Sequence, residues 1–291
     1  MEEDRKVKTG KASLLDIVRH LIRKGVGIPT IPSIAQKVLQ ATQNPDCTLA
    51  ELEAIVRQDP ALAARIIKVV NSSFFAGMKE IRTLPAAFMR LGFKRVRDLA
   101  VAVGMKNVYK GVDGHLKKEL EFLWRNAVAA GTACRETSLA CGDQNSEEAF
   151  LAGLVHDIGS AFIIQVLHGL GKKDPSIAAL PQATLKELLL ALHPTVGAEM
   201  LESWNFPKVI SHAVRHHHDP EKAAPDDRLS WILAAGDLLV RKLGLDGRRP
   251  EEDLPLAPQR AFQSLKLGDL QIGKLLVDLE EKTKEIAEAL A

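Results

Sequence analysis

Cysteine and net charge are scarce in this chain of 291 residues. It has three cysteines, Cys47, Cys134 and Cys141, and no two of them form a C-x-x-C unit. An odd number of unpaired cysteines argues against a disulfide framework. Lysine and arginine exceed the acidic residues by only two charges. That excess offers no strong attraction for nucleic acid or for an anionic membrane.

Long apolar segments are also missing. The first twelve residues are charged and lack the apolar stretch of a signal peptide, and no run of 18 or more apolar residues follows. We therefore expect a cytoplasmic protein without a membrane partner. One basic cluster, formed by Arg90, Lys94, Arg95 and Arg97, resembles a phosphate-binding surface. Such residues on a helix more often form a solvated face, so nucleic acid is not an expected partner.

Apolar residues recur at helical spacing almost throughout, and no convincing segment alternates with the two-residue period of a strand. The sequence therefore predicts an all-α fold. Thr48 and Glu51 make a capping box, and Asp59 before Pro60 places an N-cap ahead of a proline at the first helical position. Thr83 begins another helix, which Gly92 ends.

Two glycines and an aspartate at 110–114 separate the chain into two halves. We expect a disordered tail at 1–13, an N-terminal helical subdomain at 14–108, a helical bundle at 115–243, and a linker with a C-terminal amphipathic helix at 244–291. Within the bundle, Thr184 predicts a helix start and His193-Pro194 predicts a break between two helices. The last helix either packs back on the body or forms the contact of a homodimer.

His156 and Asp157 stand side by side at the end of an apolar helix, where the pair is costly unless something binds both side chains. His193, the run 216–218 and Asp237 follow on later helices. Imidazoles and carboxylates distributed in this way can hold one or two divalent transition metals. The sequence therefore predicts a metal site, and a hydrogen-bonded polar cluster without metal is the alternative.

Four short motifs precede the His-Asp pair, and their order and spacing resemble those of the HDOD family of bacterial signalling proteins. They are Pro29-Thr30-Ile31-Pro32, Asp59-Pro60-Ala61-Leu62, Val70-Asn71-Ser72 and Leu91-Gly92. The resemblance runs from about residue 28 to 240. It implies N-terminal helices packed against a bundle related to the HD and HD-GYP phosphohydrolases, whose catalytic residues are frequently lost in this family.

The same resemblance implies which residues bind metal. His156, Asp157 and Asp237 match one position, and His193, His217 and His218 match a second, with Asp157 bridging. Iron, manganese or zinc is the expected ion, at one or two positions. Which two histidines of the run 216–218 face the site stays open.

Two departures from the pattern of active relatives bear on catalysis. Asn126 stands where those relatives have the first histidine ligand, and an amide is a poorer ligand for these ions. Ser160 stands where a phosphate-binding lysine often follows the His-Asp pair. We therefore expect a non-catalytic signalling module that binds a partner protein or a small regulatory ligand in the groove between its halves. The alternative is a metal-dependent phosphohydrolase in which Asp157 is essential.

Overall fold

The computed structural model describes residues 20, 33–44, 46–71, 80–224 and 226–290. Within these ranges the chain is helical and contains no strand, which confirms the all-α prediction. The expected tail at 1–13 and the motif at 29–32 lie outside the described residues.

Four helices form the N-terminal group: α2 (Ser33–Gln43), α3 (Leu49–Val56), α4 (Pro60–Val70) and α5 (Leu84–Met105). Their predicted starts are confirmed. The Thr48 hydroxyl accepts from Glu51 N in a complete capping box, and the Asp59 carboxylate accepts from the first N–H groups of α4. Gly92 has a φ of 74°, a left-handed conformation that favours glycine, so α5 is two helical segments joined at a kink there.

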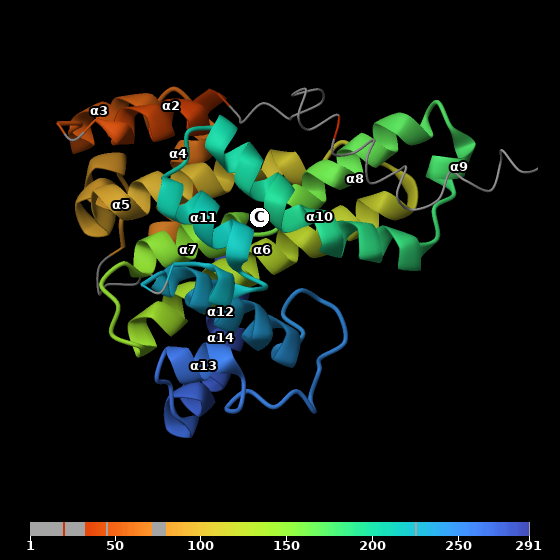
Figure 1. The fold of residues 1–291 in the computed structure, drawn as a ribbon. Helices are drawn as coiled ribbons and strands as arrows, with labels where there is room; N and C mark the ends of the chain where they lie inside the picture. Colours follow the sequence, from red (N-terminus) through yellow and green to blue (C-terminus); the bar gives the residue numbers. More distant parts are fainter. Residues whose placement is uncertain (1–19, 21–32, 45, 72–79, 225, 291) are drawn as a thin grey trace, which may run out of the picture.

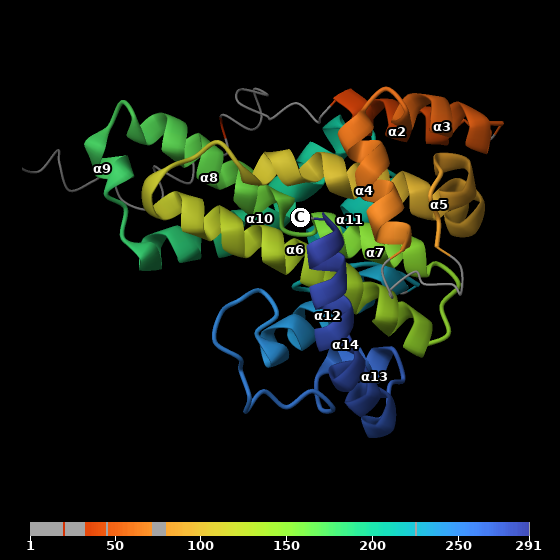
Figure 2. The same ribbon diagram turned by 180° about the vertical axis from the view of Figure 1, so that it is seen from behind.

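The second group is built around α6, a helix of 27 residues that contacts α7, α8, α12 and α14 (Figures 1 and 2). Its members are η3 (Lys106–Tyr109), α6 (Gly114–Ala140), α7 (Ser146–Val155), α8 (Ile158–Gly171), α9 (Pro175–Ala178), α10 (Gln182–Ser203), α11 (Lys208–His216), η4 (Pro220–Lys222) and α12 (Arg228–Leu243). Residues 110–113 separate η3 from α6, at the position of the sequence boundary. The domain limits themselves stay a prediction.

The predicted break at His193-Pro194 is wrong, because α10 runs through it as one helix from Gln182 to Ser203. Thr184 is accordingly inside the helix and not at its start. A proline in a helix removes one N–H, the donor that would have bonded to the carbonyl of Leu190. Leu190 is 66% exposed, so water can reach this part of the helix. Packing of α10 against both α8 and α11 holds its two halves in line.

Residues 146–171, which form α7 and α8, are apolar enough over 26 residues to pass a length-and-composition test for a membrane span. The apolar window is 89% buried inside the protein, as expected for core helices that neighbouring helices surround. The turn that carries His156 and Asp157 separates α7 from α8 in the middle of this segment. This segment is therefore the centre of the bundle.

The C-terminal segment contributes α13 (Arg260–Ser264) and α14 (Asp269–Leu290). Ile272, Leu275, Leu279 and Ile286 of α14 are buried, and the helix contacts α6 and α4. Figure 2 shows α14 crossing α6 and ending near the middle of the molecule. The last helix thus packs back on the body and connects the bundle with the N-terminal group. A contact between α5 and α7 also joins the two groups.

Candidate metal centre

Five of the six predicted ligands come together in the bundle, where His156, His193 and His217 are buried, Asp157 is half-buried and His218 is exposed. His156 ends α7 and Asp157 precedes α8, while His193 lies in the middle of α10 and His217 and His218 follow α11. Two overlapping groups have ligand atoms within 4.8 Å of one another: His193 with His217 and His218, and His156 with Asp157 and His217. The first group has the three histidines of one predicted position, whereas the second contains His217 in place of the predicted Asp237, so the ligand set itself stays a prediction.

Glycines allow the neighbouring helices to approach the His-Asp pair closely. A Cβ on Gly153 would lie 2.5 Å from the carbonyl oxygen of Ala130 in α6, and one on Gly159 would lie 2.2 Å from that of His193 in α10. Both distances are far below van der Waals contact, so only glycine fits. The glycines three residues before and two residues after the pair therefore set its distance from α6 and α10.

A third glycine acts in the same way beside Asp237. A Cβ on Gly236 would lie 2.5 Å from the sulfur of Cys134, which is fully buried in α6. The thiol occupies the space that a side chain at 236 would need. This contact explains why glycine precedes Asp237, and it gives buried Cys134 a packing role.

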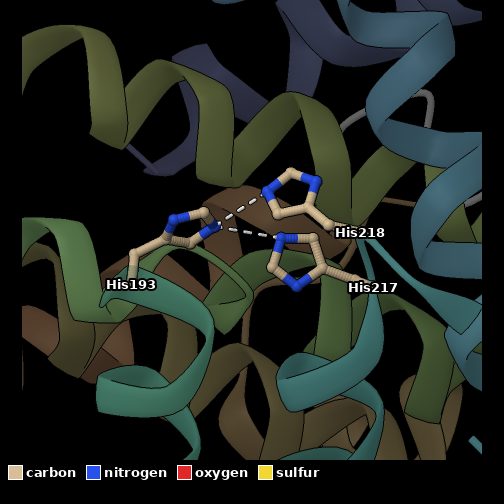
Figure 3. Close-up of side chains that lie close together, drawn as sticks. All are labelled: His193, His217 and His218. Carbon is tan, nitrogen blue, oxygen red and sulfur yellow. Dashed lines mark hydrogen bonds between the residues drawn. The ribbon is translucent and has the colours of Figure 1, made fainter. Parts of the chain in front are cut away.

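His193 is at the centre of the cluster. Its Nε2 lies 3.2 Å from Nε2 of His217, 3.1 Å from Nε2 of His218 and 3.2 Å from Oδ1 of Asp157. Figure 3 shows the rings of His217 and His218 facing His193 from one side. His216 takes no part, since its ring packs against His212 with centroids 4.7 Å apart. The structure thus decides which histidines of the run face the site.

The hydrogen bonds of the outer ring nitrogens determine what the inner nitrogens can do. Nδ1 of His193 lies 2.8 Å from the carbonyl oxygen of Leu189, and Nδ1 of His217 lies 2.6 Å from the carbonyl oxygen of Val214. A carbonyl only accepts, so each Nδ1 carries a hydrogen and donates it. In a neutral ring Nε2 then bears a lone pair, and the two lone pairs face each other at 3.2 Å. Such an arrangement needs a proton or a cation between them.

Burial and the neighbouring imidazoles of His218 and His156 hold the pKa of His217 well below its ordinary value, which disfavours a proton there. The pKa of His218 is lowered to about 4 by partial burial and by His193. Neutral imidazoles with free Nε2 lone pairs, fixed by Nδ1–H donation to a carbonyl, are the form in which histidine binds transition metals. The donor set therefore fits a divalent transition metal.

His156 and Asp157 behave as an ion pair in the absence of a cation. Burial would lower the pKa of His156, but Asp157 and Asp237 outweigh that effect and raise it to about 9. Burial would likewise raise the pKa of Asp157, but His156 and His193 hold it well below its usual value. His156 Nε2 lies 3.3 Å from Asp157 Oδ2. The two charges thus compensate each other within the protein.

Asn126 contacts the site directly. Its Nδ2 donates a hydrogen bond to Oδ2 of Asp157 at 2.8 Å, so the amide orients a carboxylate that the sequence predicts as a ligand and offers no imidazole nitrogen of its own. Ser160 is buried, with 4% of its surface exposed. The backbone N–H of Ser160 donates to the carbonyl oxygen of Asp157 at 2.9 Å, so both departures noted in the sequence lie beside the His-Asp pair.

Asp237 lies at the edge and has no hydrogen bond to the other five residues in the described part of the chain. Burial raises its pKa, while His156 lowers it, which shows that the two side chains lie close enough to interact electrostatically. Its ion pair is with Arg241 at 3.9 Å. Arg241, which the sequence did not single out, is itself held by two hydrogen bonds to Glu251.

Comparison with known proteins agrees with this architecture. The family model described as "HDOD domain" matches residues 28–220. The chain belongs to the HDOD family. Among curated proteins, an uncharacterized protein of Treponema pallidum (strain Nichols) is 28% identical over 237 residues, which are 78% of this chain and 44% of the relative. The chain thus spans less than half the length of that relative.

Solved structures share the fold over nearly the whole HDOD chain. One is a protein of Shewanella amazonensis SB2B called a "putative metal-dependent phosphohydrolase", with a TM-score of 0.77, 21% identity, and coverage of 97% of this chain and 99% of that one. An HDOD domain protein with unknown function from Geobacter sulfurreducens has a TM-score of 0.76, 19% identity, and coverage of 96% and 98%. A "putative signal transduction protein" of Marinobacter aquaeolei VT8 has a TM-score of 0.69, 21% identity, and coverage of 96% and 65%. At these identities the similarity shows the fold alone.

Proposed function

We propose that this HDOD protein is a signal-transduction module that keeps a metal site in its bundle as a structural anchor and does not hydrolyse phosphate esters. The observation that carries the proposal is the 2.8 Å hydrogen bond from Asn126 to Asp157. By resemblance to active relatives, Asn126 stands in place of the first histidine ligand, and its amide hydrogen-bonds the carboxylate of Asp157 where an imidazole would bind metal. The names of the Marinobacter and Shewanella proteins are compatible with either a signalling or a hydrolytic role.

The residues around the site offer little positive charge for a phosphate substrate, which also favours a binding role over hydrolysis. A phosphate substrate needs positive charge close to the metals, and buried Ser160 cannot supply it. Arg241 is engaged by Glu251 and Asp237. If metal is bound, it would be iron, manganese or zinc, held by His193, His217 and His218, with His156 and Asp157 at a neighbouring position.

The test is an assay of the purified protein on bis-(p-nitrophenyl) phosphate, mononucleotides and cyclic dinucleotides, with manganese, iron or zinc supplied. We expect no turnover above that of the metal alone. Turnover that disappears in Asp157→Ala but persists in His216→Ala would overturn the proposal. His216 is the matched control because it adjoins the cluster and faces away from it.

Metal-dependent hydrolysis is the second candidate, and the cluster of three Nε2 atoms favours it. In this reading a bound metal would supply an activated water, His193, His217 and His218 would hold the ion, and Asp157 would orient it. Elemental analysis of protein purified without chelator separates the candidates only in part, because a structural anchor also binds metal. The turnover assay therefore decides between them.

A further inference from the structure

A pocket lies at the junction of the two helical groups, apart from the metal centre. It has a volume of about 510 Å³. One wall comes from η3 and the residues after it, including Lys106, Lys110 and Val112, and the other comes from the first half of α6, including Lys117 and Trp124. None of the six predicted metal ligands lines it. Its position, between the end of the N-terminal group and the start of the bundle, is where a ligand could influence both.

Positive charge is concentrated around this pocket. Lys106, Lys110, Lys117 and Arg125 line it, and Glu121 is the single acidic residue among its lining residues. The side chains of Lys110 and Lys117 form no hydrogen bond or ion pair with the described part of the chain. Four positive side chains around one carboxylate leave an excess of positive charge, and an anion in the pocket would relieve the repulsion among them.

Lys106 shows the effect of this crowding. Its pKa is lowered by burial and then by the positive charges of Arg65, Lys110 and Lys68. Its ammonium group donates to the carbonyl oxygen of Leu290 at the end of α14 and lies 6.0 Å from the ring centre of Trp124. The pocket thus contains a cation held in place by the C-terminal helix, beside two lysines that have no ionic partner among the described residues.

The remaining walls are apolar and partly aromatic. Trp124 is half-buried and packs against Tyr109 with ring centroids 5.5 Å apart, and Val112 and Leu120 complete the surface. A site that recognised only an inorganic anion would need no such surface. A volume of this size accommodates a small organic molecule, and lysines bind phosphate as point charges.

We propose that this junction pocket binds a phosphorylated small molecule with a planar apolar part, the chemical class of the nucleotides. The phosphates lie among Lys106, Lys110 and Lys117, and the planar part lies against Trp124 and its apolar neighbours. The idea that the bound molecule is the input signal of this protein rests on the proposed function. The binding itself does not depend on the proposed function.

The experiment is calorimetric titration of the full chain with ATP, GTP, AMP and GMP, with guanosine and inorganic pyrophosphate as the separate parts. A chelator is present, so that metal-bridged binding at the histidine cluster does not contribute. We expect at least one nucleotide to bind, and guanosine and pyrophosphate each to bind at least about tenfold more weakly. Lys110→Gln/Lys117→Gln should weaken nucleotide binding at least about tenfold, because two charged contacts are lost. Lys172→Gln/Lys173→Gln, which changes two exposed lysines after α8, should leave it unchanged.

Three results would overturn the proposal: no binding of any nucleotide at millimolar concentration, equal binding of pyrophosphate and nucleotides, or equal affinity of the two double variants. The outcomes also separate this inference from the proposed function. Binding accompanied by hydrolysis of the nucleotide once metal is restored would refute the non-catalytic role and leave the pocket in place. Absence of both binding and turnover would refute the pocket alone.

Discussion

Gly159→Ala should disrupt the contact that brings α8 and α10 together at the metal centre. The new Cβ would lie 2.2 Å from the carbonyl oxygen of His193 and 2.6 Å from the amide nitrogen of Gly197, and both atoms belong to the backbone of α10. Restoring an ordinary contact of 3.4 Å requires the helices to separate by about 1.2 Å. No rotamer change can relieve the clash, because neither partner is a side chain.

Overpacking of this kind costs about 1 to 3 kcal/mol, and the higher helix propensity of alanine returns up to about 1 kcal/mol. We expect a net loss of about 2 kcal/mol in the free energy of unfolding, measured by denaturant titration with far-UV circular dichroism. The separation would also move His193 Nε2 away from Asp157 Oδ1, now at 3.2 Å. Metal content measured by mass spectrometry should therefore fall in the same variant.

Gly169→Ala is the matched control in the same helix, because nothing lies within 4 Å of the added Cβ. It should leave stability unchanged or raise it by up to about 1 kcal/mol. Gly197→Ala, whose Cβ would meet its nearest atoms at 3.3 Å, should fall between the two. If Gly159→Ala proved as stable as Gly169→Ala, the close approach of α8 and α10 could not be what positions the site.

Three other predictions concern titration, ligand replacement and thiol access. Burial raises the pKa of Asp98 to about 7. Between about pH 4 and 7 the folded protein therefore keeps a proton on Asp98 that the unfolded chain has released. The stability that this proton contributes is lost as the pH rises towards 7. In urea titrations the wild type should lose about 2 kcal/mol relative to Asp98→Asn between pH 5 and 7, and a pH-independent difference would contradict this. Asn126→His should restore a ligand and raise the metal content per chain, and unchanged stoichiometry would show that position 126 does not limit binding. Cys47 and Cys141 should react with a thiol reagent in the folded protein and Cys134 only after unfolding, because Cys134 is fully buried and burial raises its pKa; three rapidly reacting thiols would refute that packing.

Several helix starts were predictable from local signals, although the start predicted at Thr184 was wrong. The Thr48 capping box and the Asp59 cap need only neighbouring backbone N–H groups, so residues a few positions apart specify them. The break predicted at Pro194 was wrong because proline's local cost was outweighed by packing of α10 against α8 and α11. That packing involves residues far away in the chain.

The site shows the same division. The residue types of the cluster were evident from sequence, since histidines and carboxylates on successive helices indicate metal binding. The glycines at 153, 159 and 236 carried no comparable signal, because a close approach between helices is a property of two segments at once. Arg241 is different, because it follows Asp237 by four residues in α12 and helical spacing alone could have indicated that ion pair. Only its contact with Glu251, which lies beyond the helix, needed the tertiary structure.

By itself, the sequence determined the helical class, most helix starts, the family and the chemical identity of the candidate ligands, because these depend on local spacing and residue type. Only the tertiary structure decided that His217 and His218 face His193 while His216 turns away, that Asn126 hydrogen-bonds Asp157, and that three lysines and an arginine line a pocket at the junction. The physical reason is distance. Metal binding, carboxylate hydrogen bonding and charge repulsion act over a few ångströms between side chains that packing brings together from separate helices.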